Sequence, residues 1–412
     1  MDGRADLSTW ARSGAMWLTG RPDGPPSVAP APLASAMEAA AADLCRETAR
    51  WGRAVEVDGP ALLGERAAIT GMTRNGDTSV GGAARFIAVA DGWVALNLPR
   101  PEDVASLPAL VGAAIDPGDW PAVARGLAAL TTEEVVARAA LLGLAVGAPG
   151  RRRTRPASPV SVLSGGGPRT RTDRPLVVDL GSLWAAPLAA QLLGAAGARV
   201  VKVEGRHRPD GARRGSRAFF DLLNHGKECV SIDVEAAEER GFLRRILAGA
   251  DLVIEGSRPR VMEHLGIDPA ALAAAGTSWL SITAHGRTGE AANRIGFGDD
   301  AAVEGGLFVA GDPPGFVADA AADPLTGLVA AAFGAELLAG DRSAVVEAPL
   351  ARAASWAARP PVEAPVVRAG DGWAVEVDGR LVEVAPPRHR PIPSAAPALG
   401  AHDEALRAEF PG

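Results

Sequence analysis

Short apolar segments alternate with helical segments in the second half of the chain. The predicted strands are rich in Val, Ile and Leu and cover residues 176–180, 199–204, 229–233, 251–255 and 279–283. Helical patterns over 187–194 and 234–248 lie between them, the first ended by glycine and the second with paired charges on one side. Strands that alternate with helices predict an α/β fold with a doubly wound, mostly parallel sheet.

The first part of the chain has a different pattern. Two alternating segments, 85–89 and 92–98, predict a β-hairpin. The sequence Thr131-Thr132-Glu133-Glu134 predicts the capped start of a helix, and Gly143 predicts its end. Residues 71–148 are therefore predicted to form a small α+β domain.

Residues 149–174 separate these two parts. The stretch has almost no apolar periodicity, and it is rich in arginine, proline and glycine, so it is predicted to be a linker. An arm that binds phosphate or nucleic acid is the alternative interpretation. The arginines are Arg151, Arg152, Arg153, Arg155, Arg169, Arg171 and Arg174. The C-terminal segment, residues 357–412, contains a second proline-rich connection, which starts at Arg359.

Two segments of the chain resemble each other. Residues 13–20 are similar to residues 305–311, and a Pro-Pro pair follows each of them. Nine residues after the second proline of each pair stand Ser35 and Asp323, and an alanine-rich helical pattern follows both. The shared order and spacing favour a duplication over a chance likeness in an alanine-rich chain.

Composition narrows the classes of partner. The chain has 42 Lys+Arg against 49 Asp+Glu and a formal net charge of −7, which argues against nucleic acid as the partner. Its two cysteines, Cys45 and Cys229, form no CxxC motif, and its six histidines show no helical metal-ligand spacing. No metal is therefore expected. The chain also has no tyrosine, so no phenol is available as an acid or base.

The location is predicted from the start of the chain and from one uncharged run. The first residues are acidic and lack the basic-then-apolar pattern of a signal peptide. The run 180–198 reaches the length of a membrane span, but Pro187, Gln191 and three glycines favour a buried turn and helix. A cytoplasmic protein with no membrane partner is expected.

The turn after the first predicted strand bears on the cofactor. A strand, a turn and a helix that lead to an acid about 20 residues on are typical of dinucleotide binding. The G-x-G-x-x-G fingerprint is missing here, and Trp184 would crowd a pyrophosphate, so NAD is not expected. No G-x-S-x-G elbow is present either, which leaves no Ser/His/Asp set.

The segment Asp323-Pro324-Leu325-Thr326-Gly327 allows two interpretations. Asp at the N-cap followed by Pro at the first helical position is a standard helix start. The same geometry keeps a carboxylate ionised through the helix dipole and free backbone N–H groups. An ionised and oriented carboxylate beside a cleft is a candidate covalent nucleophile. The local sequence by itself favours the cap.

Several stretches after residue 175 occur together in the order found in one protein family. They are Val178–Leu180 with Ala186-Pro187, Gly197–Glu204, Asn224–Lys227, Ala250–Pro259 with Met262–Gly266, Gly286–Gly289 and Asp323–Gly327. With these motifs, residues 175–356 resemble the family III CoA-transferases, which include formyl-CoA transferase, carnitine CoA-transferase and alpha-methylacyl-CoA racemase. The resemblance implies a Rossmann-like domain and places Asp323 where the family keeps its catalytic aspartate.

The rest of the chain resembles other parts of the same family. Residues 1–70 resemble a degenerate copy of the catalytic-aspartate region, with Ser35 in place of the aspartate. Residues 71–148 resemble the family's small α+β domain, and residues 379–409 resemble its closing segment. The chain is thus similar to a rearranged or fused member. The resemblance also implies a homodimer.

The resemblance implies an acyl-CoA:carboxylate CoA-transferase that needs an acyl-CoA donor and a carboxylic acid acceptor. Asp323 would attack the thioester carbonyl to give an aspartyl-acyl anhydride, and the CoA thiolate would return to give an aspartyl-CoA thioester. By position, the residues that line the CoA site would be Trp184, Gly256, Ser257, Val261 and His264, with Phe297 near the acyl group. Arg206 and Arg258 are candidate phosphate-binding or structural cations.

The departures from the family's pattern keep other functions open. Family racemases carry a His just after the Gly that is here Gly296, and this chain has Phe297-Gly298-Asp299-Asp300, which disfavours racemisation. Asp299 and Asp300 are interpreted as exposed turn acids, with a role as bases as the alternative. Gly256-Ser257 replaces Asn-Phe, which weakens the expected adenine contacts. A non-catalytic or partner-dependent homologue, another acyl-CoA reaction such as isomerisation, and a plain nucleotide-binding module are the alternatives.

Overall fold

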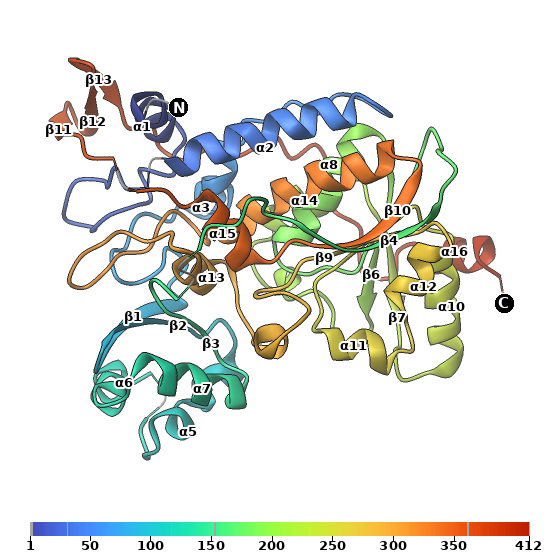
Figure 1. Cartoon of the computed structure of the whole chain (residues 1–412), viewed down its shortest axis with the longest axis horizontal. Coiled ribbons are helices and arrows are strands. Elements are labelled where there is room, and N and C mark those ends of the chain that lie inside the picture. The colour runs from blue at the N-terminus through green and yellow to red at the C-terminus, as the bar shows by residue number, and fades with distance from the viewer. Residues whose placement is uncertain (1–2, 31, 117, 152–153, 361, 412) are drawn as a thin grey trace.

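The computed structural model describes residues 3–30, 32–116, 118–151, 154–360 and 362–411. Arg152 and Arg153 of the predicted linker lie outside the described residues. A seven-stranded sheet forms the centre of the molecule, and a small three-stranded sheet with its own helices lies at one corner (Figure 1). This confirms the predicted fold class, an α/β domain with a mostly parallel sheet and a small α+β domain.

The large sheet has the strand order of a Rossmann fold. Its order is β4-β10-β9-β8-β5-β6-β7, and all neighbours pair in parallel except β4 and β10. The parallel strands are β5 (Leu176–Asp179), β6 (Arg199–Gly205), β7 (Glu228–Ile232), β8 (Leu252–Glu255), β9 (Ser278–Ser281) and β10 (Arg342–Glu347). The chain reverses direction across the sheet between β5 and β8, which is where such folds bind their ligands.

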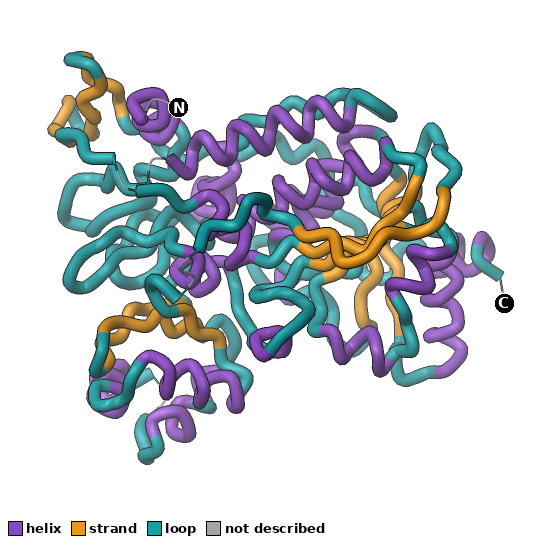
Figure 2. The backbone as a smooth tube through the Cα atoms, in the orientation of Figure 1, coloured by secondary structure: helices purple, strands orange, loops and turns teal. Residues whose placement is uncertain are grey.

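The strands of this sheet are apolar on both faces, as parallel strands covered by helices must be. Side chains alternate along each strand, so Val177 belongs to one core and Val178 to the other. Helices α8 (Ala185–Ala196) and α14 (Ala322–Ala339) cover the first face. Four helices cover the second: α10 (Ala237–Ala248), α11 (Pro259–His264), α12 (Pro269–Ala274) and α16 (Asp403–Glu409). Figure 2 shows the helices on both sides of the strands.

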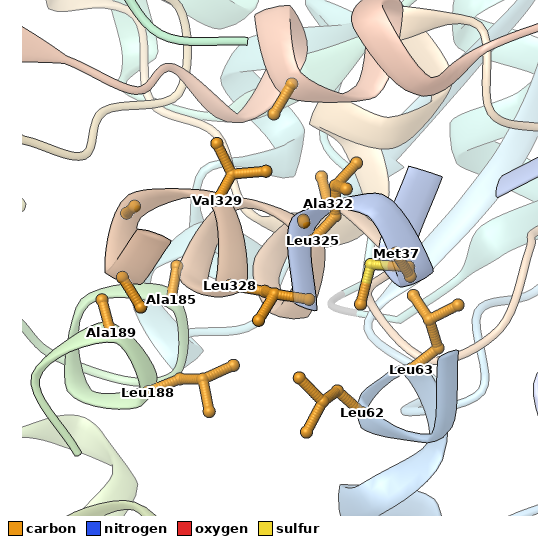
Figure 3. Packing of buried hydrophobic residues seen from close by; sticks show 14 of the residues in the cluster. Met37, Leu62, Leu63, Ala185, Leu188, Ala189, Ala322, Leu325, Leu328 and Val329 are labelled. Atoms are coloured by element: carbon orange, nitrogen blue, oxygen red, sulfur yellow. The ribbon is translucent and has the colours of Figure 1, made fainter. Parts of the chain in front are cut away.

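Helix α14 is apolar on every side. By length and composition it would pass for a membrane span, with a mean hydropathy of 1.3 over 18 residues, but 83% of that window is buried inside the protein. It packs against α8 on one side and against α2 (Pro32–Thr48) of the N-terminal segment on another. Figure 3 shows Leu325, Leu328 and Val329 of α14 among side chains from α2, α8 and the 3-10 helix η1 (Pro60–Gly64).

The predicted run 180–198 is the loop after β5 and helix α8, and its apolar residues are buried. Helix α8 continues through Gly194, where the sequence predicts its end, and stops at Gly197 with φ 118°. Thus a glycine inside a helix did not end it, because packing of both helix faces outweighs its low intrinsic propensity.

The small domain contains the predicted hairpin and the predicted capped helix. Strands β1 (Ala84–Val89) and β2 (Gly92–Asn97) pair antiparallel, and β3 (Ala145–Gly147) pairs with β2. Helix α7 (Thr132–Leu142) has a capping box at Thr131 and ends at Gly143 with φ 67°. The other helices of this domain are α4 (Pro101–Ala105), α5 (Leu107–Val111) and α6 (Trp120–Leu127).

The small domain docks on the Rossmann domain through α13 (Gly298–Gly305). A Cβ at Gly147 would lie 1.9 Å from the backbone oxygen of Asp300, so only glycine allows β3 to approach this helix. Phe86 of β1 and Phe316 pack with ring centroids 4.6 Å apart at the same junction.

The predicted linker contains a strand that the sequence analysis missed. Strand β4 (Ser161–Pro168) pairs antiparallel with β10 as the edge of the large sheet. Its glycines hid the pattern, yet they are what permits the pairing, because a Cβ at Gly166 would lie 2.2 Å from Ser343 Oγ and 2.6 Å from the Ala273 oxygen. The linker interpretation is therefore wrong for residues 161–168.

The two similar segments fold in the same order. A short helix, α1 (Gly3–Arg12) or α13, comes first in each of them. An isolated antiparallel bridge follows, Gly20 with Pro26 in one segment and Val309 with Gly315 in the other, and then the long helix α2 or α14. This common order supports the duplication.

The remaining helices and strands lie around the two domains and in the C-terminal segment. Helix α3 (Glu65–Thr70) follows η1, helix α15 (Leu350–Ala357) follows β10, and helix α9 (Arg217–Asn224) lies between β6 and β7. The C-terminal segment forms a third, antiparallel sheet of β11 (Val366–Ala369), β12 (Gly372–Val377) and β13 (Arg380–Glu383). Two further short 3-10 helices are η2 (Gly211–Arg214) and η3 (Glu290–Asn293).

The glycines of β4 allow a direct test of its place in the sheet. We expect Gly166→Ala to lower the free energy of unfolding by about 1–3 kcal/mol, because the added methyl group meets Ser343 and the Ala273 backbone. Gly165→Ala is the matched control, since a Cβ there has open space around it, and it should change stability by less than about 1 kcal/mol. Urea unfolding followed by circular dichroism measures both. Equal, small effects would mean that this segment is a loose linker after all.

Candidate active site

Two loops meet where the strand order of the sheet reverses. The loop after β5 carries Gly181 to Trp184, and the loop after β8 carries Gly256 to Arg258. Since β5 and β8 are adjacent and parallel, their carboxyl ends lie at the same edge of the sheet. The topology therefore brings together two groups of residues that the sequence analysis assigned to one site.

Buried charges hold the loop after β5. Lys202 Nζ donates to the Gly181 carbonyl at 2.9 Å, and Asp179 Oδ1 accepts from the Gly181 N–H at 2.9 Å. Asp179 is in turn paired with Lys227 at 2.8 Å, and Asp210 accepts from the Leu183 N–H at 2.9 Å. Leu183 adopts φ 68°, a left-handed conformation that is unfavourable for a branched residue. The polar network thus fixes the strained loop that presents Trp184.

Burial disfavours the charged forms of Lys227 and Asp179. Neighbouring charges outweigh burial for Asp179 but not for Lys227. Burial lowers the pKa of Lys227 to about 8, in spite of the neighbouring Asp179 carboxylate. Although burial alone would raise the pKa of Asp179, the charges of Lys227 and Lys202 hold it below its usual value. All three side chains have hydrogen-bond partners, so we assign the network a structural role.

Asp323 lies in the first turn of α14 and is not its N-cap. The helix begins at Ala322 with Ala321 as the N-cap residue, and no side chain caps it. The carboxylate of Asp323 turns instead toward α13, where a Cβ at Gly298 would lie 2.5 Å from Asp323 Oδ2. Glycine is thus required at position 298, and its backbone N–H donates to this carboxylate. Asp323 remains partly accessible to solvent.

The surroundings of Asp323 favour its neutral form. Burial raises the pKa of Asp323 to about 7, and the carboxylates of Asp299 and Asp319 act in the same direction. The Arg66 guanidinium and the Gly298 N–H act against them. A carboxyl group with a pKa near neutrality is typical of functional sites, where the two protonation states must both be accessible.

Asp299 and Asp300 are not exposed turn acids, as the sequence suggested. Both lie in the first turn of α13 and are buried, with exposed fractions of 7% and 0%. Asp299 Oδ1 accepts from the Ala320 N–H at 3.2 Å, and Asp300 Oδ1 accepts from Asn97 Nδ2 at 2.8 Å and from the Phe297 N–H at 2.9 Å. Free N–H groups at helix starts explain why these acids are buried there. Burial raises the pKa of Asp299 to about 6 and that of Asp300 to about 8.

Arg66 brings a positive charge from the N-terminal segment. It forms a two-pronged ion pair with Asp319, in which Nε and Asp319 Oδ2 are 2.9 Å apart, and Asp319 is fully buried. The same guanidinium lies 5.1 Å from the ring centroid of Trp184. Trp184 itself is 2% exposed and packs edge-on against Phe219 at 4.9 Å. Arg66 and Asp319 were missed by the sequence analysis, because no local pattern links residues 253 positions apart.

Glu304 of α13 pairs with two basic residues. His285 Nδ1 is 3.4 Å from Glu304 Oε1, and Arg294 Nη2 is 2.7 Å from Glu304 Oε2. Although burial works against its charge, the hydrogen bonds and charges of His285 and Arg294 lower the pKa of Glu304 to about 2. A Cβ at Gly296 would lie 3.3 Å from His285 Nε2 and 2.8 Å from Asp300 Oδ2, so the imidazole and the acid face the same glycine.

A cluster of arginines lies over the loop after β8. Burial lowers the pKa of Arg258, and the nearby positive charges of Arg260, Arg100 and Arg208 lower it further. Arg100 comes from the small domain, and its guanidinium lies 5.8 Å from the Phe297 ring centroid. Arg100 is paired with Asp103 of the same domain, and the other positive charges around Arg258 favour an anion there. Phe297 precedes Gly298, the first residue of α13, so two consecutive residues link the cluster to Asp323.

The structure places most of the residues predicted for the site in two groups. Trp184 and Asp323 lie near Arg66, and Phe297 precedes Gly298, which contacts Asp323. Gly256, Ser257, Arg258, Val261 and His264 lie in the loop after β8 and on α11, beside the arginine cluster. Ser257 donates from N–H and Oγ to Glu255 Oε2, both at 2.7 Å. Arg206 is exposed and pairs with Glu239 at 3.3 Å, whereas Arg208, two residues on, lies near Arg258.

The N-terminal segment carries a counterpart of Asp323. Ser35 lies near the start of α2, and its Oγ hydrogen-bonds to the Asp6 carboxylate of α1. Counted back from Gly14 and Gly306, the positive-φ glycines that follow the two short helices, Asp6 corresponds to Gly298. The segment thus has a hydroxyl where Asp323 has a carboxylate, and a carboxylate where Gly298 has only backbone.

Two hollows lie on other parts of the molecule. A groove of about 590 Å³ lies on the N-terminal segment beside α1 and α2, and a second of about 610 Å³ lies on the small domain. Neither is lined by Asp323. Across the described residues, no group of three or more His, Cys, Asp or Glu side chains is arranged to hold a metal ion.

The chain matches known proteins over its Rossmann domain. Residues 175–360 match the model of CoA-transferase family III. The succinyl-CoA–D-citramalate CoA-transferase of Chloroflexus aurantiacus is 30% identical over 154 residues, which are 33% of this chain and 37% of that protein. The succinate–glutarate CoA-transferase of Agrobacterium fabrum is 30% identical over 157 residues, 34% of this chain and 39% of that protein. The chain thus spans less than half the length of these curated relatives.

A solved structure is also similar. The crystal structure of a hypothetical protein from Mycobacterium tuberculosis is 28% identical, covers 51% of this chain and 65% of that one, and superposes with a TM-score of 0.44.

The raised pKa of Asp323 predicts how stability depends on pH. The folded protein keeps a proton on Asp323 up to about pH 7, whereas the unfolded chain releases it near pH 3.8. Asp323 therefore destabilises the fold progressively as the pH rises from about 4 to 7. We expect Asp323→Asn to be more stable than the wild type at pH 8, and its advantage to shrink by on the order of 2 kcal/mol at pH 5.

Thermal or urea unfolding at the two pH values measures this advantage. Asp173→Asn, which removes a carboxylate from an exposed position, is the matched control and should not differ between them. An equal effect of Asp323→Asn at both pH values would show that this carboxyl titrates normally.

Proposed function

We propose that this chain, which matches the model of CoA-transferase family III over residues 175–360, transfers coenzyme A from an acyl-CoA thioester to a carboxylic acid. Because the match covers less than half of the relatives' length, the activity is argued from the site. The observation that carries it is the position of Asp323. This carboxylate is partly accessible, rests on the Gly298 backbone and lies near Arg66, whose guanidinium contacts Trp184 of the loop after β5.

Asp323 suits covalent transfer because carboxylates make activated acyl derivatives. In the proposed reaction an Asp323 oxygen bonds to the thioester carbonyl carbon, the C–S bond breaks, and CoA leaves as a thiolate. The thiolate then attacks the aspartyl carbonyl and expels the donor acid, which leaves an aspartyl-CoA thioester. The acceptor carboxylate repeats the two steps in reverse, so that the new acyl-CoA departs and Asp323 is regenerated. The thioester energy is conserved throughout, so no ATP is required.

The arginine cluster supplies the charge that coenzyme A needs. Coenzyme A carries several phosphate charges, and guanidinium groups bind phosphate through charge-assisted hydrogen bonds. We propose that Arg258, with Arg100, Arg208 and Arg260 around it, binds these phosphates at the loop after β8. The pantetheine arm would then run past Phe297 toward Asp323, since Arg100 contacts the Phe297 ring and Gly298 contacts Asp323.

The acyl group is proposed to be apolar. Phe297 stands where the family's transferases commonly place a tyrosine, and this chain has no tyrosine at all. Two relatives are named for acids that carry two carboxyl groups, D-citramalate and glutarate. A phenyl ring offers no hydrogen bond to a second carboxylate, so an aliphatic or aromatic acyl group is favoured over a small dicarboxylate.

The proposal has a specific rival. His285 and Asp300 face the same glycine, Gly296, and an imidazole beside a carboxyl of raised pKa is a plausible pair for proton transfer. Isomerisation of an acyl-CoA at the carbon next to the thioester is therefore the second candidate. It predicts uptake of deuterium at that carbon in heavy water, which simple CoA transfer does not.

The homodimer and the cytoplasmic location inferred from the sequence remain part of the proposal.

Trapping of the acyl-enzyme tests the function directly. Incubation with an acyl-CoA and hydroxylamine should convert the Asp323 carboxyl to a hydroxamate, which peptide mass spectrometry locates. Asp323→Asn should still bind CoA and lose turnover by at least about 10³-fold, because the nucleophile is gone. Ser35→Ala is the matched control for the duplicate position and should keep turnover. Binding of CoA without any modification would favour a non-catalytic homologue. Failure to bind CoA would contradict the proposed CoA transfer.

Calorimetric titration with CoA tests the arginine cluster. We expect Arg258→Gln to weaken CoA binding about tenfold and to flatten its dependence on salt, since one phosphate contact is lost. Arg206→Gln is the comparison, because Arg206 is already paired with Glu239 and should change binding little. If Arg206→Gln has the larger effect, the phosphates bind near Arg206, directly after β6, and not at Arg258.

A further inference from the structure

The turn that leads into Asp323 is strained. Ala318 and Ala320 adopt φ 50° and φ 47°, in the left-handed region that residues with a Cβ rarely occupy. Asp319 stands between them, and the Asp323 N–H donates to the Ala320 carbonyl at 2.8 Å. Two such alanines in one short turn persist only where the surroundings enforce them. The position of Asp323 therefore depends on whatever holds residues 318–320.

The N-terminal segment holds this turn at three points. Thr19 Oγ1 accepts from the Ala318 N–H at 3.0 Å, and the Leu63 carbonyl accepts from the Asp319 N–H at 3.4 Å. Arg66 binds the Asp319 carboxylate with Nε at 2.9 Å and with a second bond from Nη2. These contacts join the turn to residues more than 240 positions earlier in the chain.

Arg66 is itself fixed in place. Its guanidinium lies over Trp184, and a Cβ at Gly81 would lie 3.0 Å from Nη2, so the small domain also closes around it. The side chain retains an exposed fraction of 28%, while its partner Asp319 is fully buried. A guanidinium held by a planar two-pronged pair and an aromatic face has little freedom to move away.

The charges around Asp323 come from three elements. Asp299 belongs to α13, Asp319 to the strained turn, and Arg66 to α3. Asp299 in turn accepts from the Ser79 side chain, and Asp300 lies beside it on α13. Of these groups Arg66 is the cation, so it is what balances the carboxylates that crowd Asp323.

We propose that Arg66 is a positioning residue for Asp323. Its pair with Asp319 holds the turn that orients the carboxyl group, and its charge favours the ionised form of that group against the acids around it. The duplicated N-terminal segment, which has Ser35 in place of a second nucleophile, thereby serves the site that remains. The consequence for catalysis rests on the proposed function, whereas the effect on the Asp323 carboxyl does not.

Labelling of Asp323 by a carbodiimide tests the charge effect without any CoA. Carbodiimides react with protonated carboxyls, and glycine methyl ester traps the product as an amide that peptide mass spectrometry locates at Asp323. The labelling of wild-type Asp323 should fall with a midpoint near pH 7. Arg66→Met should raise this midpoint by about one pH unit or more, and Arg66→Lys should largely restore it.

Two further variants separate charge from general damage. Asp319→Asn removes a neighbouring anion and leaves Arg66 in place, so it should lower the midpoint, opposite to Arg66→Met. Mere loosening of the fold would move both midpoints the same way. Arg50→Met, which removes an arginine paired with Glu47 at the end of α2, is the matched control and should leave the midpoint unchanged. If Arg66→Met fails to fold, Arg66→Lys and Asp319→Asn still decide the direction.

The outcomes distinguish this inference from the proposed function. A midpoint that Arg66→Met does not move, in a folded protein, overturns the role of Arg66 even if the wild type forms the hydroxamate. Shifted midpoints in a wild type that forms no acyl-enzyme overturn the transfer reaction and leave the charge effect intact. Where both hold, the pH profile of kcat for Arg66→Met should shift upward with the midpoint.

Discussion

Helix α14 has no polar face, and this constraint organises the molecule. A helix that is apolar all round must be covered on every side. The sheet and α8 cover part of it, as in any doubly wound fold, and α2 of the N-terminal segment covers a further side. Figure 3 shows how closely Met37 and Leu62 of that segment approach Leu325 and Leu328 of α14. The N-terminal segment is therefore part of the core of the Rossmann domain and not an appendage.

The candidate active site lies at the start of this helix for the same reason. Burial of α14 brings Asp323 to the junction of the Rossmann domain, the N-terminal segment and the small domain. Each part contributes: α13 supplies Gly298 and Asp299, the N-terminal segment supplies Arg66, and the small domain supplies Asn97 and Arg100. A site assembled from three parts of the chain is more buried than a surface loop, and this burial, together with the carboxylates of Asp299 and Asp319, raises the pKa of Asp323.

Local sequence predicted the elements of the fold well and their environment poorly. The Val-rich strands and the capped helix at Thr131 were found because their patterns are local. Strand β4 was missed because its glycines carry no apolar pattern, although they are needed for close contact with Ser343 and Ala273. Asp299 and Asp300 follow a glycine and resemble a surface turn, yet α13 is surrounded by the small domain and α15, so both are buried.

The sequence by itself determined the fold class and the order of the motifs, since these rest on residues near one another in the chain, and its resemblance to a family singled out Asp323 as the candidate nucleophile. The tertiary structure decided what surrounds Asp323. Arg66 and Asp319, 253 positions apart, form an ion pair because the N-terminal segment packs against α14 and the turn before it. Arg258 joins Arg100 only because the small domain docks beside the loop after β8. Charge interactions depend on distance in space, and a linear pattern does not contain that distance.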